Sequence, residues 1–143
     1  MYTRRPKESH RDTVAYEIDM LGFCARRVMR DEHADQRDQS VYLEAFLLHF
    51  RNLIRFLSGE QHRADDLSTA NPTVWADREL TQAEVAAITN PAKALDTKYH
   101  QSISKYLQHC TRLRFDHDRA WDLTLMLQEI TPVITAFEHA FPG

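Results

Sequence analysis

Hydrophobic residues recur along most of this chain at intervals of three and four, the spacing of one face of an α-helix. The first such segment extends from about Ser9 to Asp35. Its apolar stripe comprises Val14, Ile18, Leu21, Ala25 and Val28. Gly22 lies on the same stripe, where it marks either a close helix crossing or a position that tolerates glycine. The segment is therefore predicted to be an amphipathic helix that buries one face.

The second segment, from about Gln39 to Leu57, has the most regular pattern. Its apolar positions form a stripe that consists of Leu43, Phe46, Leu47, Phe50, Leu53, Ile54 and Leu57. Tyr42, Leu48 and Phe56 extend this stripe around the helix. Such a wide stripe predicts a central helix that its neighbours contact on more than one side. We expect the helix to end at Ser58-Gly59, because glycine readily adopts the left-handed conformation that follows a helix end.

Residues 60–80 show no sustained period and contain an Asn-Pro turn signal, so they are predicted to form a long loop. A loop of this length inside a compact domain is uncommon, and it is often functional or held by an apolar anchor. Trp75 is the expected anchor, either packing over one end of the helices or contributing to a binding site.

Thr81 begins the next helical segment, where TQAE matches a capping box. We expect a short helix to about Ile88, a break near Asn90-Pro91, and a second part from Pro91 to about Arg114. A last helix is expected to start near Asp118. The apolar stripes of these two helices consist of Leu95, Tyr99, Ile103, Tyr106, Leu107 and Cys110, and of Ala120, Leu123, Leu127, Ile130, Ile134, Phe137 and Phe141.

The whole pattern predicts an all-α, antiparallel four-helix bundle. The chain has 143 residues, enough for one hydrophobic core, so residues 1–143 are expected to form a single domain with residues 1–8 flexible. Glycine occurs only three times, which excludes a Gly-rich phosphate loop and disfavours β-rich folds. The net charge of −3 indicates no general attraction to nucleic acid.

No stretch of the chain has the apolar length of a signal peptide or a membrane span, so a cytoplasmic location is expected. The two cysteines, Cys24 and Cys110, both fall on predicted helix faces. We expect them to be buried free thiols, and a single long-range disulfide is the alternative.

Eight histidines raise the question of a metal site. Histidine ligands on helices usually occur as His-x3-His or Glu-x-x-His, and neither spacing is present. Asp96 and His100 are four residues apart, but such a pair is common on solvated helix faces. We therefore expect neither a metal nor a cofactor, and a three-histidine site assembled from separate helices is the alternative.

Polar residues interrupt the apolar pattern of the central helix within the run LLHFRN. His49 lies seven residues from both Tyr42 and Phe56, and Asn52 follows it on the same side of the helix. Another polar and aromatic patch is formed by Ser102, Lys105, Tyr106 and His109. Burying such groups without partners costs about 1–3 kcal/mol each. They are expected to meet either one another, in a network that sets the helix register, or a ligand in a cleft.

The segments HFRNLIRFL and SKYLQHCTRLR, followed by Trp121, resemble a group of bacterial helical-bundle proteins and, more distantly, the HEPN superfamily. The resemblance covers about residues 40–140. HEPN domains are four- or five-helix bundles that commonly dimerise. Many are metal-independent RNases of toxin–antitoxin, phage-defence and RNA-processing systems, whereas others are binding modules without catalysis.

Active HEPN proteins carry an Arg-x4–6-His motif, in which arginine binds the scissile phosphate and histidine transfers protons. Arg51-Asn52 matches the start of this motif, but positions 56–58, where the histidine would fall, are Phe, Leu and Ser. The resemblance therefore implies a composite site in which Arg51 contacts phosphate and His109 or His49 transfers protons. The further candidate binding residues are Asn52, Lys105, Tyr106 and Trp75.

We expect a small helical module of a bacterial defence or toxin–antitoxin system, directed at RNA with or without catalysis. The alternative is a structural or interaction protein whose polar residues only specify packing. A homodimer fits both interpretations, with Phe137 and Phe141 as contributors to its surface. RNA or a cognate protein would be the further partner.

Overall fold

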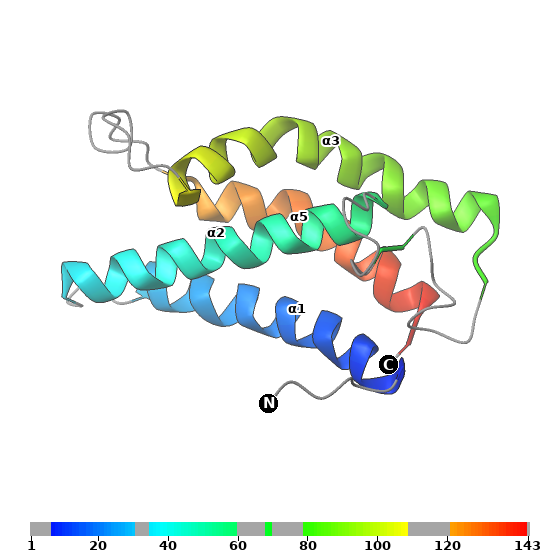
Figure 1. Cartoon of the computed structure of the whole chain (residues 1–143), viewed down its shortest axis with the longest axis horizontal. Helices are drawn as coiled ribbons and strands as arrows, with labels where there is room; N and C mark the ends of the chain where they lie inside the picture. Colours follow the sequence, from blue (N-terminus) through cyan, green and yellow to red (C-terminus); the bar gives the residue numbers. More distant parts are fainter. Residues whose placement is uncertain (1–6, 31–34, 60–67, 70–78, 109–120, 143) are drawn as a thin grey trace.

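The computed structural model describes residues 7–30, 35–59, 68–69, 79–108 and 121–142 of the chain. The regular structure in these ranges is helical and consists of α1 (Lys7–Arg30), α2 (Gln36–Ser58), α3 (Gln82–Gln108) and α5 (Leu123–Ala140) (Figure 1). This confirms the all-α prediction. The predicted flexible segment 1–8 lies outside the described residues except for its last two, which belong to α1.

The four helices pack against one another as in a four-helix bundle. α1 packs against α2, α2 against α3, and α3 against α5, which also contacts α2 (Figure 1). The most deeply buried side chains include Leu21, Phe46, Phe50, Leu53, Ile54, Ile88, Ile103, Met126, Ile130 and Phe137. Apart from Ile88 and Met126, these residues belong to the predicted stripes, and α2 has the predicted central place. Among the described helices, none is long and apolar enough to cross a membrane.

Both ends of α2 are closed by local hydrogen bonds. The Asp35 carboxylate accepts a 3.0 Å hydrogen bond from the backbone N–H of Arg37, which caps the start of the helix. At the other end Gly59 has a φ of 79°, and its N–H donates to the carbonyl of Phe56. The predicted stop at Ser58-Gly59 is confirmed, because α2 ends at Ser58.

The predicted loop 60–80 is anchored on α2 by Thr69. Its backbone N–H and its hydroxyl both lie 3.1 Å from the carbonyl oxygen of Phe56, and the hydroxyl is equally close to that of Leu57. These bonds satisfy carbonyls that the end of a helix leaves without intrahelical partners. Ser68 and Thr69 are both buried. The expected anchor, Trp75, lies outside the described residues.

The capping box at the start of α3 is confirmed. The hydroxyl of Thr81 accepts a hydrogen bond from the backbone N–H of Glu84, and the Glu84 carboxylate accepts one from the N–H of Thr81, both at 3.2 Å. This reciprocal pair satisfies two donors that the first turn of a helix leaves open. The helix follows directly, from Gln82.

The predicted break near Asn90-Pro91 is wrong, because α3 continues through Pro91. The proline lacks the N–H that would bond to Ala87, but Asn90 and Pro91 are exposed, so the loss falls on the solvent side. On the inner side, Ile88 and Ala92 are both buried in the core. Packing on each side of the proline therefore outweighs the missing hydrogen bond and keeps the two halves in one helix.

The last helix starts later than expected. Trp121 and Asp122 are not helical, and α5 begins at Leu123, where the Asp122 carboxylate accepts a 3.0 Å hydrogen bond from the N–H of Leu125. Phe137 and Phe141, the proposed dimer contacts, are only 0% and 5% exposed. They belong to the core of the monomer, so their assignment to a dimer surface is wrong.

Candidate functional site

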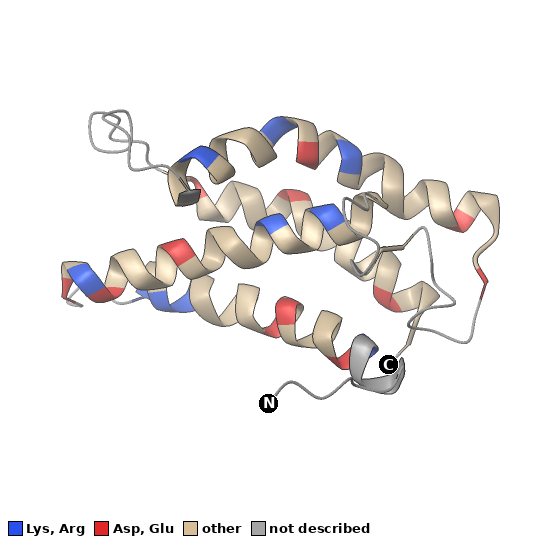
Figure 2. Ribbon diagram, in the orientation of Figure 1, with Lys and Arg blue, Asp and Glu red and all other residues tan. Residues whose placement is uncertain are grey.

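One arginine of α2 contacts a histidine of α3, and a second arginine lies one turn away on the same helix. Arg51 and Arg55 are one helical turn apart and therefore share one side of α2. The guanidinium of Arg55 donates through Nε to Nδ1 of His100 at 3.1 Å, and Nη2 of the same group contacts Nε2 of the ring. Because arginine only donates hydrogen bonds, the imidazole acts as the acceptor. Figure 2 shows Lys and Arg on facing stretches of α2 and α3.

Arg51 has no compensating charge among the residues that the structure describes. It is half-buried, and within the described part of the chain it has neither a hydrogen bond nor an ion pair. Its burial and, in second place, the positive charge of Arg55 hold the pKa of Arg51 below its ordinary value. Both causes disfavour the charged guanidinium. A bound anion would relieve both, because it would neutralise the pair and replace lost hydration.

Two more charged residues of α3 flank His100. Asp96, one turn earlier, has Oδ1 3.8 Å from Nδ1 of the imidazole, and this oxygen is buried without a hydrogen bond. Lys93 lies two turns before His100 on the same side of α3, and it is exposed. We call Arg51, Arg55, Lys93 and His100 the basic face. Asp96 contributes a carboxylate beside it.

His49 and Asn52 meet a carboxylate of α1. Nδ1 of His49 lies 2.5 Å from Oε2 of Glu17, and Nδ2 of Asn52 donates to Oε1 of the same residue at 3.3 Å. Tyr16 approaches the imidazole edge-on, with the ring centroids 5.9 Å apart. His49 is only 8% exposed. The sequence therefore correctly indicated that these two residues share a side of α2, and their shared partner is a residue of the same protein.

The structure does not bring His49 together with Arg51. Two residues apart on a helix, the side chains point about 200° away from each other. His49 accordingly contacts Glu17 of α1, whereas Arg51 lies on the side of α2 that carries Arg55 and faces α3. Of the predicted composite site, the pairing of Arg51 with His49 is thus not formed. His109, the other proposed proton-transfer residue, lies outside the described residues.

The remaining candidates lie apart from the basic face. Lys105 is exposed and follows His100 by five residues, which turns it by about 140° around α3. Tyr106 packs edge-on against Trp121, with ring centroids 5.8 Å apart, and so takes part in the packing next to α5. Trp75 lies outside the described part of the chain. Neither Lys105 nor Tyr106 therefore joins Arg51.

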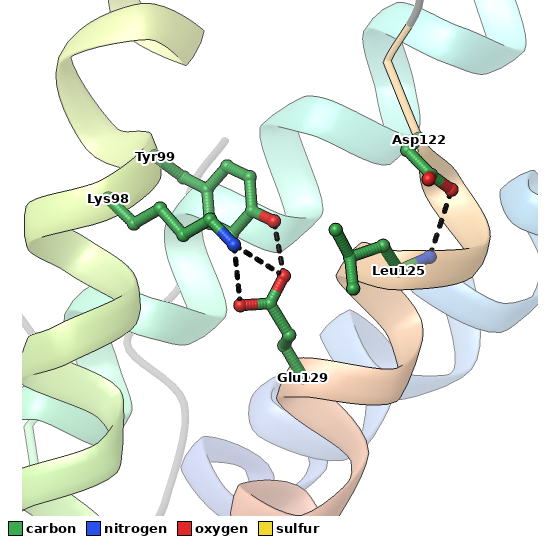
Figure 3. Close-up of polar contacts among 5 residues, drawn as sticks. All are labelled: Lys98, Tyr99, Asp122, Leu125 and Glu129. Atoms are coloured by element: carbon green, nitrogen blue, oxygen red, sulfur yellow. Dashed lines mark hydrogen bonds and ion pairs between the residues drawn. The ribbon is translucent and has the colours of Figure 1, made fainter.

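A third polar cluster connects α3 to α5. The Glu129 carboxylate accepts hydrogen bonds from Nζ of Lys98 at 2.9 and 3.0 Å and from the hydroxyl of Tyr99 (Figure 3). Tyr99 also packs edge-on against Phe50 of α2, with ring centroids 5.3 Å apart. Partial burial opposes the ionisation of Glu129, but the bonds from Tyr99 and Lys98 outweigh it and hold the pKa of Glu129 below its ordinary value. The cluster thus holds three helices together.

Replacing Glu129 with glutamine should make stability less dependent on acid pH. Because the folded protein lowers the pKa of Glu129, its stabilisation is present above the ordinary glutamate pKa of about 4.3 and is lost as the pH falls through the folded value. At pH 7 we expect Glu129→Gln to lower the free energy of unfolding by roughly 0.5–1 kcal/mol, since the carboxylate is partly exposed. Urea unfolding at pH 7 and pH 3 tests this. An equal difference at both pH values would contradict the assignment.

No cluster of three or more His, Cys, Asp or Glu side chains suitable for a metal ion occurs in the ranges that the structure describes. Cys24 is a free thiol, 1% exposed, and its burial raises the pKa of the thiol. Cys110 lies outside the described residues.

Several residues of these clusters were not singled out as site residues from the sequence: Glu17, Arg55, Lys93, Lys98, His100 and Glu129. Each stands in a polar helix position that looks like ordinary solvated surface. A signal for His100 did exist, since its i, i+4 pairing with Asp96 was apparent, but no spacing pointed to a contact between Arg55 and His100. Contacts between helices depend on how each helix is rotated relative to its neighbour, and the residue pattern within a single helix does not specify that rotation.

No family model, curated protein or solved structure matches this chain significantly. The structure shows four packed α-helices, and none of these comparisons supports the resemblance to HEPN domains.

Proposed function

We propose that this protein is an RNA-directed helical module that holds the phosphate backbone on its basic face. The observation that carries the proposal is the pair Arg51 and Arg55, one turn apart on α2, with Arg51 half-buried and without a counter-charge in the described residues. Guanidinium groups bind phosphate in a bidentate manner and are more weakly hydrated than ammonium groups. Two of them at this spacing suit adjacent oxygens of a phosphodiester.

The neighbours of the arginines fit the same role. Arg55 is held by His100, so its position is set before any ligand arrives, which reduces the ordering that binding requires. Lys93 extends the positive charge along α3. Because the net charge of the protein is −3, the protein as a whole does not attract RNA. RNA binding should therefore depend on the positive charges of the basic face.

Binding is better supported than cleavage. A general base must reach the proton that it removes, and His49 is buried against Glu17 on the other side of α2 from Arg51. The resemblance to HEPN domains accommodates this, because that superfamily includes non-catalytic binding modules. A bacterial defence or toxin–antitoxin system is the setting that the resemblance favours. Proton transfer by His109 stays a prediction.

Binding of a fluorescein-labelled single-stranded RNA of about 20 nucleotides, followed by anisotropy between 50 and 200 mM salt, tests the proposal. We expect Arg51→Ala/Arg55→Ala to weaken binding at least about tenfold and to lower the salt slope by roughly 1.4, as expected for two lost phosphate contacts. The matched control, Arg30→Ala/Arg37→Ala, removes the same charge from exposed positions elsewhere. Equal weakening by both doubles, or no binding by the wild type at 50 mM salt, would overturn the proposal.

The same samples report on catalysis. Gel analysis of the RNA after incubation shows whether the wild-type protein cleaves it. Cleavage that Arg51→Ala abolishes, while circular dichroism shows an intact fold, would extend the proposal from binding to an RNase. Binding without cleavage would support the non-catalytic module.

A second candidate function is a structural or interaction protein whose polar residues specify packing. The contact of Glu17 with both His49 and Asn52 favours it, because the carboxylate satisfies both side chains within the monomer. This candidate requires no ligand at α2. The two candidate functions differ in what they predict for Arg51→Ala/Arg55→Ala. This double substitution should weaken RNA binding by an RNA-directed module, whereas it should leave the stability and the interactions of an interaction protein unchanged.

A further inference from the structure

His100 is the member of the basic face whose charge can change near neutral pH. Its side chain is half-buried, with 27% of its surface exposed, and it has both a cation and an anion as neighbours. Arg55 of α2 donates from Nε to Nδ1 of the ring at 3.1 Å, and its Nη2 contacts Nε2. Asp96 of α3 has Oδ1 3.8 Å from the same Nδ1. The two neighbours favour opposite protonation states of the imidazole.

The contact with Arg55 requires a neutral imidazole. A neutral ring has one nitrogen that accepts a hydrogen bond, whereas both nitrogens of the protonated ring carry hydrogen and neither can accept. Arginine has no acceptor of its own and keeps its charge. Protonation of His100 would therefore remove the hydrogen bond from Arg55 and place two positive charges next to each other.

Asp96 offers the protonated ring another partner. Its Oδ1 is buried and makes no hydrogen bond within the part of the chain that the structure describes, although Nδ1 of His100 is only 3.8 Å away. A buried carboxylate oxygen without a donor is unfavourable, and an N–H on Nδ1 would supply a donor of opposite charge. Protonation would thus exchange the contact of His100 with Arg55 for a contact with Asp96.

The other charges around His100 make its protonation sensitive to a bound anion. On α2, Arg51 lies one turn before the arginine that contacts the ring, and on α3, Lys93 lies two turns before the ring. From α5, Glu129 reaches α3 in the described ranges, but it bonds to two other side chains of that helix. The cations oppose a charge on His100, and a phosphate bound among them would cancel that opposition.

The neutral ring also competes with phosphate for Arg55. A guanidinium binds a phosphate most strongly through two parallel N–H groups. Nε and Nη2 of Arg55 form one such edge, and His100 contacts both of these atoms. A protonated ring would leave this edge to the ligand and would add a positive charge of its own. Both changes favour phosphate binding.

We propose that RNA binding to the basic face is coupled to protonation of His100, in which the imidazole exchanges Arg55 for Asp96 and leaves the guanidinium to the phosphate. The proton comes from solvent, and the N–H bond is the covalent bond that forms. This inference rests on the proposed function, because it concerns the regulation of the same site. RNA should therefore bind more tightly at pH 5.5 than at pH 8.

Anisotropy of a rhodamine-labelled oligouridylate, measured at pH 5.5 and pH 8 at one ionic strength, tests the coupling, since uracil stays neutral in this range. We expect the wild type to bind at least about fivefold more tightly at pH 5.5. His100→Gln, which keeps a neutral polar side chain, should bind equally at both pH values to within about twofold. His139→Gln removes an exposed histidine of α5 and is the matched control, which should keep the gain of the wild type. Circular dichroism at both pH values checks the fold.

Asp96→Asn is a second test that retains His100. The amide lacks the negative charge that stabilises the protonated ring, so the gain at pH 5.5 should shrink to less than about twofold. An equal gain in the wild type and in His100→Gln, or a full gain in Asp96→Asn, would overturn the coupling and leave RNA binding by the basic face in place. A wild type that binds the RNA at neither pH would overturn the proposed function together with the coupling.

Discussion

Phe137→Ala is expected to lower the free energy of unfolding by about 3–5 kcal/mol, the range found when a buried aromatic ring is truncated. The ring is fully buried and joins several elements. It packs edge-on against Phe56 of α2 at 5.4 Å between centroids, and the guanidinium of Arg11 from α1 lies 5.1 Å from its centre. Losing it opens a cavity at the place where α5 meets both of these helices.

Thermal unfolding by circular dichroism checks this prediction. A loss of this size corresponds to a fall in melting temperature of roughly 10 °C for a chain of this length. Leu125→Ala is the matched control, since Leu125 is on the same helix but 41% exposed, and it should cost under about 1 kcal/mol. If Phe137 served a dimer surface instead, the loss would vary with protein concentration. A concentration-dependent loss, or a change below about 1 kcal/mol, would contradict its place in the core.

His49→Ala is expected to have the second largest effect, a loss of about 1–3 kcal/mol and several degrees in melting temperature. The substitution removes the ring that contacts Glu17 at 2.5 Å and that packs against Tyr16, and it leaves a partly buried carboxylate with a weaker set of partners. Asn52→Ala should cost only about 0.5 kcal/mol, because Asn52 is exposed and its bond to Glu17 is longer, at 3.3 Å.

A double-mutant cycle with Glu17→Ala isolates the contact. If His49 and Glu17 act as a packing pair, their combined effect should fall short of the sum of the single effects by about 0.5–3 kcal/mol. RNA binding should not change in His49→Ala, since the basic face lies on the other side of α2. An unchanged melting temperature would count against the packing role, and a selective loss of RNA binding would reassign His49 to the site.

The helices and their inner faces were predictable because their causes are local. Leu21, Phe50 and Phe137 repeat with neighbours at helical spacing, and burial of such a stripe follows from the hydrophobic effect. The capping box of Thr81 and Glu84 spans four residues and needs no other part of the protein. The α2 stop is likewise a property of Gly59 itself.

Pro91 shows where this local reasoning fails. The hydrogen bond that Pro91 cannot make is a local cost that favours a break in the helix. The burial of Ile88 and Ala92 instead stabilises the continuous helix, and this contribution depends on tertiary contacts that a local stretch of sequence does not show. The partners of the polar residues likewise depend on tertiary structure. Arg55 meets His100 across two helices, and His49 meets Glu17 across another pair.

Sequence periodicity alone thus determined that the chain is helical, which side of each helix is apolar, and that His49 and Asn52 share one side. The tertiary structure decided that their side faces Glu17, that Arg55 meets His100, and that Phe137 belongs to the interior. The reason is geometric. A helical repeat specifies directions around one axis, whereas contacts between helices depend on the rotation and register that packing of the whole core selects.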